Sequence, residues 1–119
     1  MRLAGQAKAG YYPTPAVVVD RLKHILKFPE EPFAALDPCC GEGDALALLL
    51  EGTGGRGYGV ELDLSRAKRA REKLHRAVPG AFELAKVPAR AFSLLFLNPP
   101  YAWEVGGQGE KQQRKELLF

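Results

Sequence analysis

The stretch over residues 92–101, FSLLFLNPPY, is the feature that most restricts the fold of this chain. Five of the six residues from 92 to 97 are apolar and none is charged, which is typical of a strand buried on both faces of a parallel sheet. Two prolines follow Asn98, and proline cannot continue a central strand. Asn98 and Tyr101 are therefore predicted at the carboxyl end of a strand, where open α/β sheets bind their ligands.

The rest of the sequence alternates between helical and strand patterns. The predicted elements are a helix over 14–28, a strand over 33–36, a helix over 45–50, a strand over 58–63, a helix over 65–78, a weaker strand over 81–87, the strand over 92–97 and an unfinished helix over 110–119. Thr14 and Ser65 are the expected helix caps. The order predicts an α/β fold, the N-terminal half of a doubly wound sheet with about four mainly parallel strands flanked by helices. We expect residues 1–119 to form a single partial domain, with residues 1–11 as a flexible arm.

Charge, cysteine usage and hydropathy restrict the functional class. The formal net charge of +3 comes from 17 basic and 14 acidic residues that are interspersed along the chain, so it permits a polyanionic partner without requiring one. Cys39 and Cys40 are adjacent and the two histidines lie far apart, so neither a disulfide framework nor a metal site is expected. The longest apolar run, residues 45–50, is far shorter than the roughly 20 residues of a membrane helix, and no leader pattern opens the sequence. We expect a soluble cytoplasmic protein with no membrane role.

Glycines and acids follow the first two predicted strands. Gly41 and Gly43 permit backbone amides to approach a ligand closely, while Asp37 offers a carboxylate to a cation. Their spacing matches neither a nucleotide P-loop nor the complete dinucleotide fingerprint, so a tight turn without a ligand is the alternative. Glu61, about twenty residues after the turn, stands where α/β folds hydrogen-bond ribose hydroxyls, which favours an adenosine-containing ligand. Asp63 could share that role or cap the following helix.

Four segments resemble, in order and spacing, the motifs of S-adenosylmethionine-dependent amino-methyltransferases, especially adenine-specific DNA methyltransferases. They are Thr14-Pro15, residues 36–43 (LDPCCGEG), residues 59–63 (GVELD) and residues 98–101 (NPPY), of which the last is the most specific. The resemblance implies a Rossmann-like class I methyltransferase fold, S-adenosylmethionine as the cofactor, and methyl transfer to the exocyclic amine of adenine in DNA. DNA is accordingly the expected partner. RNA or protein-glutamine amines stay open as substrates, because methyltransferases acting on them share Asn-Pro-Pro-Tyr.

The resemblance also implies a set of site residues. The cofactor-binding set is Tyr12, Thr14, Asp37, Pro38, Gly41, Gly43, Glu61 and Asp63, and the catalytic set is Asn98, Pro99, Pro100 and Tyr101. A carboxylate suits the α-ammonium of the cofactor, and a second suits its ribose diol. The Asn98 side-chain oxygen and the Pro99 carbonyl would accept hydrogen bonds from the target amine while Tyr101 stacks on the base, so catalysis would rest on positioning.

The sequence departs from the family's pattern in three ways. Residues 83–87 of the predicted third-strand region place no acid where the family often holds the adenine ring; no target-recognition domain is recognised; and the given sequence ends after the fourth predicted strand. A flipped base needs a closed pocket, so activity of the isolated chain is not assumed. The alternative of a different class is a truncated, non-catalytic relic or interaction module that keeps the fold.

The family's strand order predicts an exposed edge. It places the first strand centrally, the second and third on one side and the fourth on the other, so that residues 92–97 form an apolar edge without lysine or proline. Such an edge invites pairing with another strand. We therefore expect a two-fold homodimer that covers this edge or the C-terminal segment.

Overall fold

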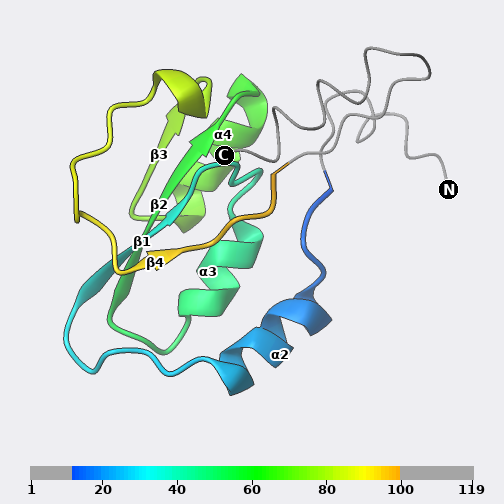
Figure 1. Cartoon of the computed structure of the whole chain (residues 1–119). Helices are drawn as coiled ribbons and strands as arrows, with labels where there is room; N and C mark the ends of the chain where they lie inside the picture. The colour runs from blue at the N-terminus through cyan, green and yellow to red at the C-terminus, as the bar shows by residue number, and fades with distance from the viewer. Residues whose placement is uncertain (1–11, 100–119) are drawn as a thin grey trace, which may run out of the picture. The chain divides into compact units, whose positions relative to one another are not determined.

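The computed structural model describes residues 12–99, which fall into two compact units. The larger unit is Pro13–Leu97, and Tyr12, Asn98 and Pro99 are the described residues of the other. The elements are α2 (Ala16–Ile25), β1 (Phe33–Asp37), α3 (Asp44–Leu50), β2 (Gly55–Glu61), α4 (Leu64–Lys73), β3 (Arg76–Pro79), the 3-10 helix η1 (Phe82–Leu84) and β4 (Leu94–Leu95) (Figure 1). The predicted arm, the unfinished helix, Pro100 and Tyr101 lie outside the described residues.

The four strands form one parallel sheet in the order β3-β2-β1-β4. β1 pairs with β2 along its whole length, from Phe33 opposite Gly55 to Asp37 opposite Gly59, and with β4 on its other side. The predicted strand order is thereby confirmed. Because β1 and β2 are adjacent and parallel, the loops that follow their carboxyl ends meet at one edge of the sheet.

α3 and α4 cover one face of the sheet (Figure 1). Alternate glycines of β2 face these helices: a Cβ atom on Gly57 would lie 2.9 Å from Leu74 Cδ2, and one on Gly59 would lie 2.5 Å from Cys40 Sγ. Because these glycines have no side chains, the helix side of the core can pack closely against β2. Parallel crossovers are almost always right-handed, so the return from β3 to β4 is expected on the opposite face.

The buried core lies between the sheet and the helices. Its members are Val19, Phe33, Ala35, Cys40, Leu46, Leu49, Leu50, Ala70, Leu74 and Ala77. Ala67 and Ala70 of α4, and Leu74 directly after it, are all buried against the sheet. Within residues 12–99 no helix has the length and apolar character needed to cross a membrane.

The first helix begins and ends at residues other than those predicted. Pro15, not Thr14, is the N-cap of α2, because Pro15 has an extended backbone and its carbonyl accepts hydrogen bonds from two amides of the first turn. The helix ends at Ile25 and does not reach Phe28. The Phe28 ring stacks on Phe33 at the start of β1, with ring centroids 5.9 Å apart, so it packs beyond the helix.

The helix α4 is capped by Asp63 and not by Ser65. The Asp63 side chain accepts a hydrogen bond from the Arg66 amide at 2.9 Å, which fits the preference for aspartate at this position. One of the two roles considered for Asp63 is therefore confirmed.

The third strand lies earlier in the sequence than predicted. α4 ends at Lys73, and β3 occupies Arg76–Pro79, where Tyr58 pairs with Arg76 and Val60 with Val78. Ala77 and Val78 continue the helical spacing of apolar residues, so periodicity alone could not distinguish the two structures. Pairing with β2 makes Arg76–Pro79 the third strand. Residues 81–87, where this strand was predicted, contain η1 and irregular backbone.

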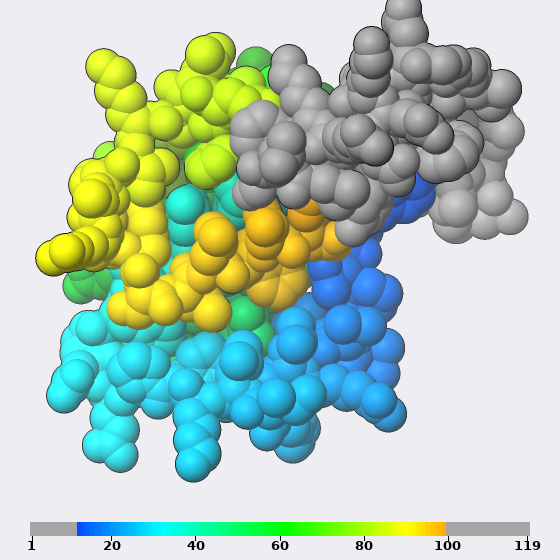
Figure 2. Space-filling model, viewed as in Figure 1, coloured from blue at the N-terminus to red at the C-terminus, as the bar shows by residue number. Residues whose placement is uncertain are grey.

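The prediction that residues 92–97 are buried on both faces is wrong. β4 spans only Leu94–Leu95, although the Ser93 and Phe96 amides also donate to β1 carbonyls. Leu95 and Leu97 are 54% and 45% exposed. These side chains are exposed because β4 lies at an edge of the described sheet. Figure 2 shows the yellow and orange atoms of this part of the chain at the surface.

Candidate functional site

Asp37 ends β1 and begins a tightly turning loop. It is 3% exposed, and its Oδ1 accepts a hydrogen bond from the Cys39 amide at 3.0 Å. Gly41 and Gly43 have φ values of 57° and 87°, a left-handed region that residues with a side chain seldom adopt. The Cys40 amide donates to a carbonyl of β2 at 2.9 Å. The loop is thus fixed to the end of the neighbouring strand.

Glu61 ends β2 and binds the glycine loop directly. Its Oε1 accepts a hydrogen bond from the Gly41 amide at 3.0 Å, while Oε2 accepts from the Asp63 amide at 2.6 Å and from Arg66 Nη2 at 3.1 Å. A carboxylate has about four lone-pair sites, so these three donors leave one acceptor site on Oε1. Glu61 can therefore hold the loop and still accept a hydrogen bond from a ligand hydroxyl.

The acid at the end of β1 has a perturbed pKa. Burial raises the pKa of the Asp37 carboxyl to about 7. The hydrogen bond from the Cys39 amide lowers this pKa, and the nearby charge of Glu61 adds to the rise. A cation beside Asp37 would favour its ionised form. Burial, together with the same two acids, raises the pKa of Cys39 to about 11 and that of Cys40 to about 12, so both thiols are protonated at neutral pH.

Most of the predicted cofactor residues gather at this end of the sheet. The residues that the two strand ends bring together are Asp37, Pro38, Gly41, Gly43, Glu61 and Asp63. Thr14 is half-buried just before α2. Tyr12, which is 50% exposed, and the half-buried Asn98 and Pro99 belong to the other unit. The roles implied for these four residues, and for the six at the strand ends, stay predictions.

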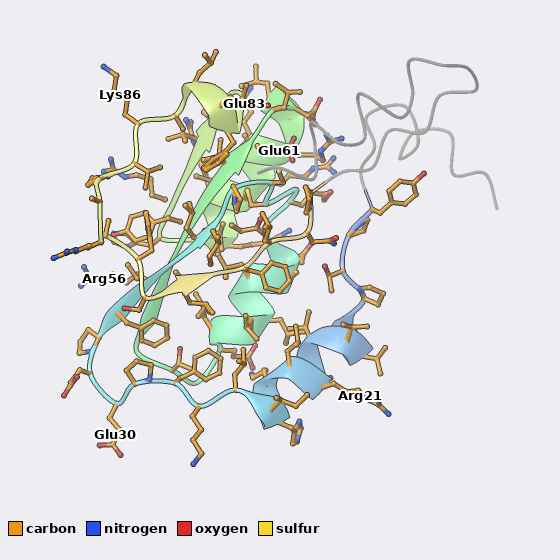
Figure 3. All side chains as sticks on the ribbon, viewed as in Figure 1. Arg21, Glu30, Arg56, Glu61, Glu83 and Lys86 are labelled. Atoms are coloured by element: carbon orange, nitrogen blue, oxygen red, sulfur yellow. The ribbon has the colours of Figure 1, made fainter. Side chains whose placement is uncertain are left out.

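Three further residues lie at the carboxyl end of the sheet that the sequence did not single out. Leu62 directly follows Glu61 and is 74% exposed. The sequence pattern that could have identified it is an apolar residue directly after a predicted site acid. Arg66 belongs to α4, which is rich in basic residues, yet its side chain is only 15% exposed in its pair with Glu61. Glu83 follows the true third strand, and Figure 3 shows it near Glu61. The predicted absence of an acid there rested on the misplaced strand.

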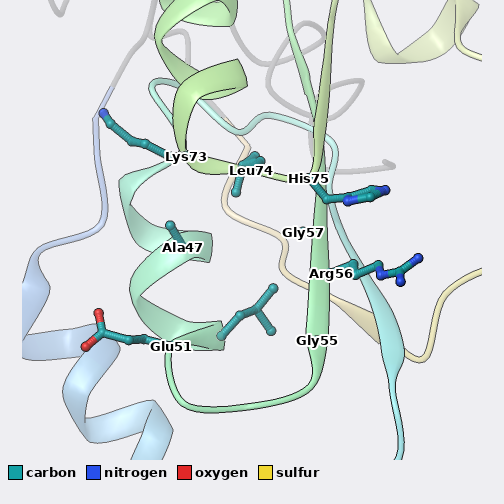
Figure 4. A pocket seen from close by; sticks show the side chains of 9 residues that line it. Ala47, Glu51, Gly55, Arg56, Gly57, Lys73, Leu74 and His75 are labelled. Atoms are coloured by element: carbon teal, nitrogen blue, oxygen red, sulfur yellow. The ribbon is translucent and has the colours of Figure 1, made fainter.

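An open depression of about 350 Å³ lies at the opposite end of β2 (Figure 4). Gly55 and Gly57 line it together with Leu50 of α3 and Leu74 after α4. It contains neither of the two acids, and open α/β sheets bind ligands at their carboxyl ends. The depression is therefore separate from the candidate site. Among residues 12–99, no cluster of three histidine, cysteine or acidic side chains could hold a metal ion.

The fold and this site define a class of protein. A parallel sheet in the order β3-β2-β1-β4, with an acid and a glycine loop after β1 and a second acid after β2, is the first half of a Rossmann-like methyltransferase domain. The family model of DUF6094, an uncharacterised methyltransferase family, matches residues 1–119, and the chain belongs to that family. No curated protein sequence matches the chain.

Solved structures with the same fold are methyltransferases of different kinds. An RNA methyltransferase from Salinibacter ruber, in complex with S-adenosyl-L-homocysteine, is 26% identical with a TM-score of 0.60 over 72% of this chain and 60% of that one. A SAM-dependent methyltransferase from Thiobacillus denitrificans, also with S-adenosyl-L-homocysteine, is 14% identical with a TM-score of 0.62 over 98% and 50%. A geranyl diphosphate methyltransferase in complex with SAM is 13% identical with a TM-score of 0.62 over 75% and 39%.

These likenesses establish the fold, while the family establishes the methyltransferase class. The chain spans 60% of the length of the first of these proteins and a smaller share of the other two. Their names include an RNA methyltransferase and an enzyme of geranyl diphosphate, so the fold does not determine the substrate.

Proposed function

We propose that this chain binds S-adenosylmethionine at the carboxyl ends of β1 and β2 and serves methyl transfer to an exocyclic amine, with adenine in DNA as the first candidate substrate. The observation that carries the proposal is the pair of buried acids, Asp37 and Glu61, on either side of one glycine loop. The family supports methyl transfer. The cofactor would supply the methyl group.

The chemistry of the loop residues fits this cofactor. Asp37 is buried without an ion pair among the described residues, and its raised pKa marks a carboxylate that a cationic ligand group would stabilise. The α-ammonium of the methionine moiety is such a group. Glu61 retains an acceptor site for a ribose hydroxyl, and the exposed Leu62 offers an apolar surface for a purine ring.

Substrate recognition is assigned to the segment after β4. Asn98 and Pro99 follow β4 after Phe96 and Leu97, and their oxygens would accept hydrogen bonds from the target amine. An amine conjugated to a ring is a poor nucleophile, so holding it in position and favouring its pyramidal form would lower the barrier. DNA adenine is preferred because Thr14-Pro15 and Asn-Pro-Pro-Tyr occur in one chain.

RNA is a second candidate substrate. A specific observation favours it: the structure that is 26% identical to this chain is named an RNA methyltransferase. A protein-glutamine amide stays a third candidate because its planar nitrogen resembles the amine of a base. A labelled-methyl transfer assay on DNA, RNA and protein would separate the three, and label in protein alone would overturn both nucleic-acid assignments.

Calorimetry tests the cofactor site independently of the substrate. S-adenosylhomocysteine should bind, and Asp37→Ala and Glu61→Ala should each weaken binding at least tenfold, the equivalent of about 1.4 kcal/mol. Glu72→Ala is a matched control, because Glu72 is an exposed acid on α4. An absence of heat at millimolar ligand would refute the proposed site.

The alternative is a non-catalytic module that keeps the fold. Transfer that is abolished by Asn98→Ala while cofactor affinity is kept would exclude it. Cofactor binding without transfer to any of the three substrates would support it.

A further inference from the structure

The face of the sheet opposite α3 and α4 carries basic side chains in a defined row. Gly55, Gly57 and Gly59 face the helices, so the alternate residues Arg56 and Tyr58 point to the other side. Arg76 is the register partner of Tyr58 on β3 and therefore lies on the same side. Figure 4 shows Arg56 and His75 projecting together on the side of β2 away from α3.

Aromatic rings occupy the middle of this row. The Tyr58 ring meets Phe92 edge-on with centroids 5.4 Å apart, and it meets His75 in the same way at 5.2 Å. Phe92 belongs to the return from β3 to β4, so this return lies over the helix-free face. Arg90, two residues before Phe92, is exposed. We call the set Arg56, Tyr58, Arg76 and Arg90 the basic face.

The charges of the basic face are not balanced by acids. None of its three arginines forms an ion pair with another residue of the described range 12–99. No strand residue that faces this side is acidic, and residues 84–99 contain no acid at all. By contrast, α4 contributes Arg66, Arg69 and Lys73 to ion pairs with acids of the helix side. Arg21 of α2 and Lys68 of α4 likewise form no ion pair within residues 12–99, so the basic face is distinguished by having its charges together on one side of the sheet.

We propose that the basic face binds the phosphate backbone of a single nucleic-acid strand. Exposed guanidinium groups beside aromatic rings form the surface that proteins use to track single strands, and a planar guanidinium fits a phosphate bidentately. The proposal rests on the proposed function, which supplies a nucleic-acid substrate, and places a second contact region away from the cofactor end. Phosphate is common to DNA and RNA, so the basic face would hold either strand without reading its sequence.

The test compares two double variants of the full chain by fluorescence anisotropy. Arg56→Gln with Arg76→Gln removes two charges from the basic face, while Arg21→Gln with Lys68→Gln removes two exposed charges from α2 and α4. The probes are labelled single-stranded DNA and RNA of one sequence and about 15 nucleotides, within the range of known site sizes. Thermal melting of all proteins verifies the fold.

The basic-face variant should bind both probes about tenfold more weakly, and the slope of log K against log salt should fall by about 1.4, or 0.7 for each lost phosphate contact. The control variant should keep most of the affinity. Equal weakening by the control, a loss restricted to DNA or to RNA, or no binding of either probe by the native chain would overturn the basic face. Calorimetry with S-adenosylhomocysteine reports separately on the cofactor site, so the two proposals fail by different measurements.

Discussion

Asp37 shows how a single buried acid can connect stability with ligand binding. Its carboxyl is 3% exposed, and burial raises its pKa to about 7 from an ordinary value of 3.8. The folded chain therefore binds this proton more tightly than the unfolded chain does. Stability contributed by the protonated acid is full below about pH 4 and is lost as pH rises toward 7. Acids whose ionised form is destabilised by burial in this way are characteristic of functional sites.

Asp37→Asn should remove this pH dependence. Asparagine is uncharged and can still accept the hydrogen bond from Cys39, so the variant should be more stable than the native chain above pH 7 by as much as about 4 kcal/mol, with little difference near pH 4. Urea unfolding at both pH values measures the effect. Parallel stability profiles of the two proteins would contradict the assigned pKa.

Arg66 and Arg69 lie one turn apart on α4 but have different surroundings. The pair Arg66–Glu61 has side chains that are 15% and 7% exposed, whereas the Arg69–Glu42 pair is 61% and 23% exposed. Arg66→Gln should therefore destabilise the chain by about 3 kcal/mol, because it leaves Glu61 buried with its charge. Arg69→Gln should cost less than about 1 kcal/mol.

A double variant measures whether Arg66 and Glu61 are energetically coupled or whether each substitution destabilises the chain independently. Adding Glu61→Gln to Arg66→Gln removes the unpaired charge, so the combined loss should be smaller than the sum of the two single losses. Strictly additive losses in urea unfolding would show that the pair is not coupled.

At the scale of elements, β4 is one of the two edge strands of the described sheet. It has β1 on one side and no described strand on the other, and Leu95 is 54% exposed. We predict a two-fold dimer through this edge, and Leu95→Lys should break it because a charged side chain on an edge opposes pairing. Light scattering at tens of micromolar should give a dimer mass for the native chain and a monomer mass for the variant.

Leu84→Lys provides the control for the edge. Leu84 is more exposed than Leu95, at 83%, but it belongs to η1 and not to the sheet. Its substitution should leave the dimer intact. A native chain that is monomeric, with rapidly exchanging amides over residues 92–97, would rule out association through β4.

At the scale of the whole molecule, cofactor binding should be visible as stabilisation. A ligand at one hundred times its dissociation constant adds about 2.7 kcal/mol to the free energy of unfolding, and for a domain of this size that corresponds to a rise in melting temperature of roughly 10 °C or more. Thermal scans with S-adenosylhomocysteine measure it. The rise should be greater at pH 8 than at pH 5.5, because the ligand's cation favours ionised Asp37, whose pKa is about 7 in the free chain.

Asp37→Asn again gives the discriminating variant. It should show a smaller rise in melting temperature that is the same at both pH values, since asparagine does not titrate. A native chain whose melting temperature is unaffected by the ligand at either pH would count against cofactor binding at this site.

Local signals in the sequence were sufficient for most of the sheet. The apolar run of β1, the glycine turn after Asp37 and the acid at Glu61 each depend on residues close in sequence, and the structure has them as predicted. The order of the strands also followed, because the resemblance covers the motifs that set it. The methyltransferase class is confirmed by the family.

Only the tertiary structure decided the features that depend on distant partners. Val78 fits a helix by spacing, but pairing with Val60 makes it part of β3. Leu95 has the pattern of a buried strand, but its place at the edge leaves it exposed. Arg66 has the same sequence context as other basic helix residues, but the fold places Glu61 beside it. In each case the sequence determined which residue is available, while the free energy of its contacts depended on which residues the fold placed next to it.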